Sequence, residues 1–154
     1  SRPIVAVPAQ PVPDPPLLPY AEALLGRSLG TLETVFDARR DLEWVRHLPA
    51  DDPWHGRTDA HPAVLVWAAN VLVRDAISFS PGRWKHAGAL TTHYAHVPDG
   101  ASLRYCGRVD RTFRAGTHEL FVAEVLVEAN GEAAALLDLT YLCETRPEEV
   151  DADD

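Results

Sequence analysis

Aspartates and histidines cluster just ahead of the most apolar segment of the chain. Asp51, Asp52 and His55 lie in the stretch DDPWH, and His61 follows shortly after them. The next eleven residues, 63–73, read AVLVWAANVLV. A carboxylate and an imidazole that share one water can take a proton from it and deliver a proton elsewhere, so this cluster could be an acid–base site. The alternative is that these side chains cap a turn and a buried helix.

The apolar segment must position these groups, and we expect it to be a helix over residues 62–77. Proline is favourable at the first helical position, because its missing N–H would have no intrahelical partner. The segment is apolar nearly all round, with Trp67 and Asn70 as its polar handles, so burial on most sides is expected. Asp59 is the predicted N-cap. The Asn70 amide must form a hydrogen bond, either to a neighbouring strand or loop or to a substrate.

The remaining elements are read from turn signals and from changes of hydrophobic period. Seven of the thirteen prolines fall in residues 1–19, which predicts an extended arm. The acidic run 148–154 predicts a frayed tail, and residues 20–147 form one predicted domain. The predicted helices are 20–27 and 42–48, the latter capped by Asp41, and the predicted strands are 31–36, 86–97, 102–113, 118–129 and 133–145. This order predicts an α+β fold in which one antiparallel sheet wraps a single apolar helix, with an edge strand that favours pairing into a dimer.

Composition excludes several classes of function. The chain of 154 residues is long enough for one domain with a real core, since 46% of its residues are hydrophobic. Its net charge of −9 disfavours binding to nucleic acid or to an anionic membrane. The apolar segment 63–73 is too short to span a bilayer. Cys106 and Cys143 form no CxxC pair, and with no recognisable signal peptide they indicate a reducing, cytoplasmic setting, with a disulfide as the less favoured alternative.

The distribution of charge and the motifs that are absent limit the kinds of ligand that the sequence predicts. Residues 81–118 carry six basic side chains against two acidic ones, so this segment could hold an anionic ligand or form a solvated arginine face. His93 and His96 are three apart on a predicted strand and should point to opposite faces. Without a recognisable metal motif, Gly-rich phosphate loop or GxSxG elbow, no metal or cofactor is predicted.

Several segments of the chain together resemble a known family. The segments HPAVLVWAANVLV, PGRWKHAG, THYAHVPDG, GTHELFVAEVLVEANG and TYLCETRP are similar to those of MaoC-like hotdog proteins, within the acyl-dehydratase and R-specific enoyl-CoA hydratase superfamily. The resemblance covers about residues 15–147. It implies a hotdog fold, an acyl-CoA or acyl-carrier-protein thioester as substrate, and a homodimer or a hetero-oligomer with a related hotdog chain.

The same resemblance implies roles for particular residues. Hydratases of this family carry a motif of the form Asp-x-Asn-Pro-x-His, and the nearest match here is Asp51-Asp52-Pro53-Trp54-His55. His55 with Asp51 or Asp52 would then be the acid–base pair, although Asp51 is one residue closer to the histidine than the family's aspartate. Backbone N–H groups at the helix start would bind the thioester oxygen. The implied substrate-binding residues are His61, Ala63, Val64, Asn70, His86, Arg104 and Arg108, the two arginines meeting the phosphates of CoA or phosphopantetheine.

Three alternatives to a hydratase or dehydratase stay open. A hotdog thioesterase would use an acidic residue in or just ahead of the central helix. Residues 62–74 contain none, but Asp59 is available. A noncatalytic acyl-binding or partner subunit is the second alternative, and an enzyme of altered chemistry in natural-product assembly, such as a cyclase, is the third.

Overall fold

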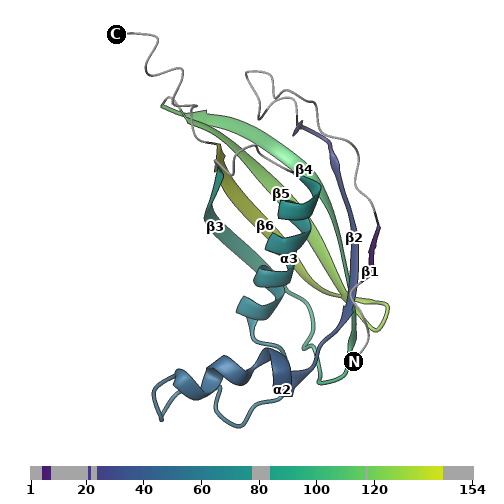
Figure 1. The fold of residues 1–154 in the computed structure, drawn as a ribbon, viewed down its shortest axis with the longest axis vertical. Helices are drawn as coiled ribbons and strands as arrows, with labels where there is room; N and C mark the ends of the chain where they lie inside the picture. The colour runs from purple at the N-terminus through teal and green to yellow at the C-terminus, as the bar shows by residue number, and fades with distance from the viewer. Residues whose placement is uncertain (1–4, 8–20, 22–23, 78–83, 117, 144–154) are drawn as a thin grey trace.

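The protein is built on one curved sheet that holds one long helix. The computed structural model describes residues 5–7, 21, 24–77, 84–116 and 118–143. Six antiparallel strands lie in the order β1-β2-β4-β5-β6-β3, and α3 lies along the concave face of the sheet (Figure 1). The strands are β1 (Val5–Val7), β2 (Ser28–Val35), β3 (Trp84–His93), β4 (Ser102–Ala115), β5 (His118–Ala129) and β6 (Glu132–Cys143), and the helices are α2 (Ala38–Asp41), the 3₁₀ helix η1 (Glu43–His47) and α3 (Pro62–Ala76).

Strands β4, β5 and β6 form the meander that the turn signals predict. Asn130 and Gly131 both have positive φ, as a tight hairpin between right-twisted strands requires. The largest difference from the predicted strands concerns β3, which ends at His93 rather than at residue 97. The chain leaves the sheet there, and Val97 O accepts a hydrogen bond from Ala60 N at 2.9 Å. The segment after β3 is thereby tied to the loop that precedes α3.

Helix α3 uses one of its faces to make the core. Leu65, Ala69, Leu72 and Val73 are buried in the cluster that includes the inner side chains of the sheet. Trp67, on another face, is 71% exposed. The expectation that the helix would be buried on most sides is therefore wrong, because a single sheet covers only one side of it.

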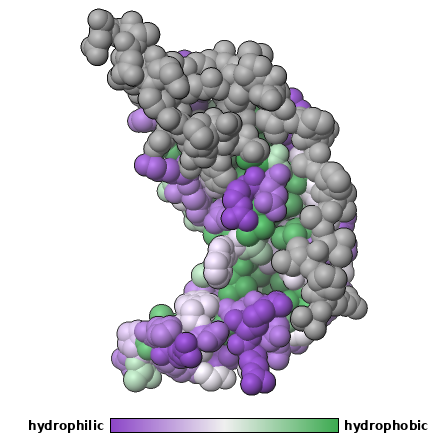
Figure 2. All heavy atoms as spheres, viewed as in Figure 1, coloured by the Kyte–Doolittle hydropathy of each residue, from purple (hydrophilic) through white to green (hydrophobic). Residues whose placement is uncertain are grey.

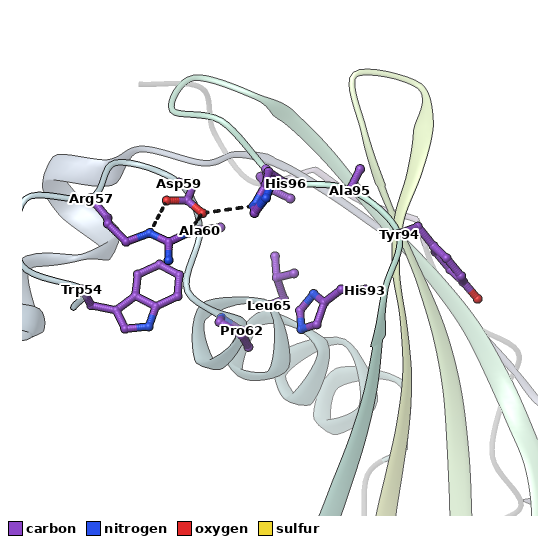
Figure 3. Close-up of a pocket in the computed structure, with 11 residues that line it drawn as sticks. Trp54, Arg57, Asp59, Ala60, Pro62, Leu65, His93, Tyr94, Ala95 and His96 are labelled. Atoms are coloured by element: carbon purple, nitrogen blue, oxygen red, sulfur yellow. Dashed lines mark hydrogen bonds and ion pairs between the residues drawn. The ribbon is translucent and has the colours of Figure 1, made fainter. Parts of the chain in front are cut away.

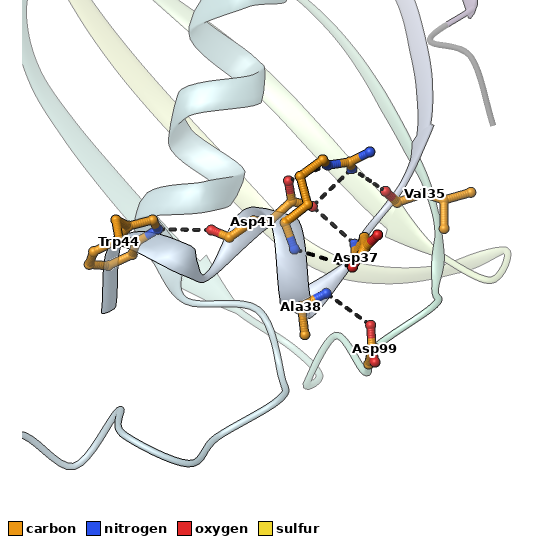
Figure 4. A network of polar contacts seen from close by, with 7 residues as sticks. Val35, Asp37, Ala38, Asp41, Trp44 and Asp99 are labelled. Carbon is orange, nitrogen blue, oxygen red and sulfur yellow. Dashed lines mark hydrogen bonds and ion pairs between the residues drawn. The ribbon is translucent and has the colours of Figure 1, made fainter. Parts of the chain in front are cut away.

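The segment between β2 and α3 is fixed by carboxylates (Figure 4). Asp37 caps α2 by accepting from Arg40 N at 3.3 Å, and Asp41 accepts from Asp37 N at 3.0 Å. Asp99 accepts from Ala38 N at 2.9 Å, which joins α2 to the turn before β4. The helix predicted over 42–48 is the 3₁₀ helix η1. Its N-cap residue is Leu42, which makes no side-chain cap, so the predicted Asp41 cap is wrong. A separate short helix, α2, precedes it and is capped by Asp37.

Parts of the predicted organisation fall outside the described residues. This holds for most of the proline-rich arm and for the acidic tail. Three arm residues form β1, an edge strand paired antiparallel with β2. Ala21 and Leu24, from the predicted helix over 20–27, are buried in the core. Among the described helices, none is both long and apolar enough to cross a membrane.

Gly107 of β4 occupies a position where the sheet leaves no room for a side chain. A Cβ at Gly107 would lie 2.3 Å from the backbone oxygen of Glu124. We expect Gly107→Ala to lower the free energy of unfolding by about 1–3 kcal/mol, because the paired strands must separate locally. Gly88→Ala on β3 is the matched control, since a Cβ there has no neighbouring atom within 4 Å. Urea denaturation measures both, and equal midpoints would contradict the described pairing of β4 with β5.

Candidate active site

A cavity of about 450 Å³ opens beside the N-terminus of α3 (Figure 3). Its walls come from the loop before α3, from the first turns of the helix, and from the chain that follows β3. In Figure 3, Asp59 and His96 point toward each other on one side of the cavity, whereas Tyr94 points away from it. The lining residues are Trp54, Arg57, Asp59, Ala60, Pro62, Leu65, His93, Tyr94, Ala95, His96 and Val97.

The early end of β3 creates this cavity. Tyr94 N and Ala95 N both donate to Ala134 O, at 2.8 and 3.2 Å, where the chain turns away from the sheet. The bond from Ala60 N to Val97 O then holds the two crossing segments together. As a result, Asp59 Oδ2 lies 3.4 Å from His96 Nδ1, although the two residues are far apart in the sequence.

Arg57 sets the charge of Asp59. Its Nε and a terminal nitrogen contact the two carboxylate oxygens at 2.9 and 2.5 Å, and its guanidinium carbon lies 4.0 Å from the ring centroid of Trp54. These hydrogen bonds lower the pKa of Asp59 from its ordinary value. Asp59 therefore stays ionised near neutral pH and presents a carboxylate to the adjacent imidazole.

His61, not Asp59, caps α3. Its Nδ1 accepts a hydrogen bond from Ala63 N at 3.0 Å, and its ring packs 4.9 Å from Trp44 and 4.4 Å from Trp54. The predicted Asp59 cap is wrong because Arg57 engages that carboxylate. The predicted thioester donors are also occupied, since Ala63 N binds the His61 ring and Val64 N binds His61 O at 2.9 Å.

The acid–base trio expected from the motif lies elsewhere in the loop. Asp52 Oδ1 accepts from Trp54 N at 2.9 Å, which is a turn cap. His55 Nε2 lies 2.8 Å from Pro49 O, and Asp51 is exposed. None of the three lines this cavity or the second cavity described below. Asp52 and His55 thus contact the backbone of the loop and of the chain just before it.

Two other predicted binding residues, Asn70 in the middle of α3 and His86 on β3, lie away from the start of the helix. The Tyr141 hydroxyl of β6 donates a short hydrogen bond to Asn70 Oδ1, so Asn70 has a strand partner. His86 is exposed at the start of β3, with Nε2 2.7 Å from Gly88 O and its ring 5.2 Å from that of Tyr141. Neither residue lines the cavity at the helix start.

The basic side chains of β4 point away from the helix. Arg104 lies 3.8 Å from Glu33 and 3.9 Å from Glu128, and Arg108 lies 3.5 Å from Asp110. They alternate with buried residues of β4, so they occupy the outer face of the sheet. The net positive charge of this segment is thus offset by acids on neighbouring strands, and the structure does not bring Arg104 or Arg108 to the cavity.

Sequence reasoning missed His93 and His96 as site residues. The expectation that they face opposite sides of one strand fails, because β3 ends at His93 and His96 lies in the crossing segment. The one feature of the sequence that could have indicated their position is Pro98, which follows them closely and disfavours a regular strand there. Among the described residues, no group of three or more His, Cys, Asp or Glu side chains is placed to hold a metal ion.

Comparisons with known proteins find this fold in solved structures. No family model matches the sequence, and no curated protein matches it. The structure titled (R)-hydratase from A. caviae involved in PHA biosynthesis is 14% identical, with a TM-score of 0.58 over 76% of this chain and 94% of that one. A MaoC-like dehydratase from Rhodospirillum rubrum is 12% identical, with a TM-score of 0.60 over 80% and 94%. A thioesterase superfamily member from Thermus thermophilus is 16% identical, with a TM-score of 0.57 over 93% and 90%.

These likenesses confirm the predicted α+β hotdog fold, a long antiparallel sheet around one central helix. At the level of the fold, they also confirm the predicted resemblance to MaoC-like proteins. The neighbours include both hydratase and thioesterase structures, so the fold alone does not decide the reaction.

The His61 cap gives a prediction about stability and pH. Burial is the main cause that lowers the pKa of His61, with Arg57 adding to the lowering and Asp52 opposing it. The unfolded chain therefore binds more protons as pH falls through about 6.5. The free energy of unfolding should therefore fall as the pH drops below about 6.5, because protonation of His61 favours the unfolded chain. Urea denaturation across pH should show this loss in the wild type.

Two variants distinguish the stability that comes from the cap hydrogen bond of His61 from the pH dependence that comes from protonation of its ring. His61→Ala should lose about 1 kcal/mol at pH 8, because Ala63 N loses its acceptor. His61→Asn should retain most of that stability and have a flatter pH dependence below about 6.5, because its amide accepts without titrating. A pH dependence in His61→Asn identical to that of the wild type would show that another group is responsible.

Proposed function

We propose that the protein is a hydratase or dehydratase of acyl thioesters carried by CoA or by an acyl carrier protein, with Asp59 and His96 as its acid–base pair. The observation that supports this most directly is the 3.4 Å approach of these two side chains at the rim of a cavity at the start of α3, where the His96 side chain is 87% exposed and the Asp59 side chain is 23% exposed. The sequence predicted Asp–His chemistry at this end of the helix. The proposal keeps that chemistry and assigns it to a different pair of residues.

The proposed steps follow from the charge of Asp59. Because Asp59 is ionised, it favours the His96 tautomer with its proton on Nδ1, which leaves Nε2 free as a base. In hydration, Nε2 takes a proton from water while the oxygen bonds to Cβ of the enoyl thioester. The electron pair of the double bond moves toward the thioester carbonyl. The proton on Nε2 then passes to Cα, and dehydration is the reverse.

The developing charge on the thioester oxygen needs a donor. The N–H groups of Ala63 and Val64 are engaged by His61. His93 lies in the cavity near Leu65 (Figure 3), and we assign its ring N–H as the candidate donor. Leu65 and Pro62 supply an apolar wall against the substrate.

Thioester hydrolysis is the second candidate. Asp59 stands just ahead of α3, which is where the sequence analysis expects the acidic residue of a hotdog thioesterase. In that reaction, the same pair would direct water at the carbonyl carbon and release a free thiol. The two reactions share a base and differ in the carbon attacked.

Assays with crotonyl-CoA test the proposal. Loss of enoyl absorbance indicates hydration, and release of free thiol indicates hydrolysis. His96→Gln should reduce the hydration rate by on the order of a hundredfold or more, because the proton acceptor is lost. Asp59→Asn should also reduce it. His47→Gln, an exposed histidine of η1, is the matched control and should retain the wild-type rate.

Further outcomes separate the alternatives. Loss of hydration in His55→Gln, with His96→Gln unaffected, would return the acid–base role to the DDPWH motif. Absence of both reactions, with thermal stabilisation by an acyl thioester, would indicate a noncatalytic acyl-binding subunit.

We also propose that β3 pairs with a second copy of the chain, or with a related hotdog chain. β3 is the last strand of the sheet, and nearly all of its described side chains are exposed. A long strand with an open edge is a template for pairing. Its end forms one wall of the candidate active site, so a partner on this edge would help to enclose the substrate.

Leu90 of β3, which is 67% exposed, tests this pairing. Leu90→Lys should shift the protein toward the mass of a single chain in sedimentation velocity, because a charge would have to enter the interface. Leu25→Lys is the control, since Leu25 is similarly exposed in the turn before β2. A wild-type protein that sediments as a single chain at all concentrations would contradict the proposal.

A further inference from the structure

A second cavity lies on the other side of α3 from the candidate active site. It is an open groove with a volume of about 340 Å³, within the range of small-molecule pockets, and its lining residues come from α2, α3, β2 and β4. Figure 2 shows apolar side chains gathered in the hollow of this face. We call this cavity the α3 groove. At roughly 30 Å³ for each non-hydrogen atom, it has room for about ten such atoms.

Helix α3 has a second apolar stripe that lines this groove. Val64, Trp67, Ala68 and Val71 follow the i, i+3, i+4, i+7 spacing of one helix face. None of the four is fully buried: Val64 and Ala68 pack partly against the core, and Trp67 is 71% exposed. The stripe therefore lies between the core and the surface, where its uncovered part offers an apolar contact to a ligand.

The floor of the groove includes a phenol that lacks an acceptor. Tyr105 is fully buried, and its hydroxyl has no hydrogen-bond partner among the described residues. Burial raises its pKa, so the hydroxyl remains protonated and can donate. An unsatisfied buried donor destabilises the free protein. A ligand that supplies an acceptor would remove this cost.

The polar end of the groove carries no uncompensated charge. Arg40 Nε lies 2.9 Å from Asp41 Oδ1, and a terminal nitrogen of Arg40 donates to Val35 O at 2.9 Å. Asp41 also accepts from Asp37 N. Because these groups satisfy one another, the groove wall does not favour an ionised ligand.

From these observations we infer that the α3 groove is a binding site for a small, uncharged, apolar molecule that carries one hydrogen-bond acceptor, such as a medium-chain ketone. The apolar stripe would contact the alkyl part, and Tyr105 would donate to the oxygen. The site is separate from the Asp59–His96 cavity and does not depend on the reaction proposed there.

Titration with methyl octyl ketone tests the inference through the fluorescence of Trp67. Binding should shift the tryptophan emission to shorter wavelength, and Trp67→Phe should abolish this change. Ala68→Phe should block binding by filling the groove. Arg74→Phe, which adds the same ring to an exposed position of the same helix, should not. Decanoate, of similar length but ionised, should bind at least tenfold more weakly than the ketone.

Tyr105→Phe provides the decisive variant. It should weaken ketone binding by about fivefold, because one hydrogen bond is lost. It should also raise the midpoint of urea denaturation of the free protein, because an unsatisfied hydroxyl is removed. The inference would be overturned if ketone affinity stayed unchanged, if the free variant were less stable, or if decanoate bound as well as the ketone. Acrylamide quenching of Trp67 should not depend on protein concentration. If quenching became weaker as the protein concentration rose, a second copy of the chain would fill the groove, and the inference would be overturned.

Discussion

The packing of one face of α3 against a single curved sheet is the constraint on which the other features depend. Leu65, Ala69, Leu72 and Val73 leave water in this contact, and apolar burial of this kind is the main favourable term in folding. A sheet can cover only one side of a helix. The remaining sides must be closed by loops or ligands, or stay open. Both cavities lie along these uncovered flanks.

The polar cavity at the start of α3 depends on how two segments of the chain are joined there. The Ala60–Val97 hydrogen bond brings the loop before α3 against the chain after β3, and these two segments supply Asp59 and His96. Arg57 keeps Asp59 ionised, and Trp54 supports both Arg57 and the His61 cap. The helix cap and the proposed acid–base pair therefore share one aromatic support, which couples the start of the helix to the geometry of the cavity.

Much of the fold could be predicted from the sequence, and less of the site. The period-two runs and the Asn130-Gly131 turn indicate the meander, and Pro62 marks the start of α3. Local spacing cannot reveal that β3 stops at His93, because the crossing segment is fixed by a contact with Ala60, which is distant in the sequence. The sequence also assigned the helix cap to Asp59 rather than to His61. Both residue types can accept from a helical N–H; in the structure Arg57 binds the Asp59 carboxylate and His61 occupies the cap position.

The two flanks of α3 differ in chemistry because they meet different chain segments. On the β3 side, the sheet ends and loops bring titratable groups together, which suits proton transfer. On the β2 side, Leu32, Leu103 and Tyr105 form a continuous strand floor, and the short helix α2 closes the end with a neutralised ion pair. The same helix therefore borders the proposed reaction site near its first turn and the apolar groove along its side. A fold with one sheet and one long helix can thus offer a proposed reaction site and a proposed second binding site within a single domain.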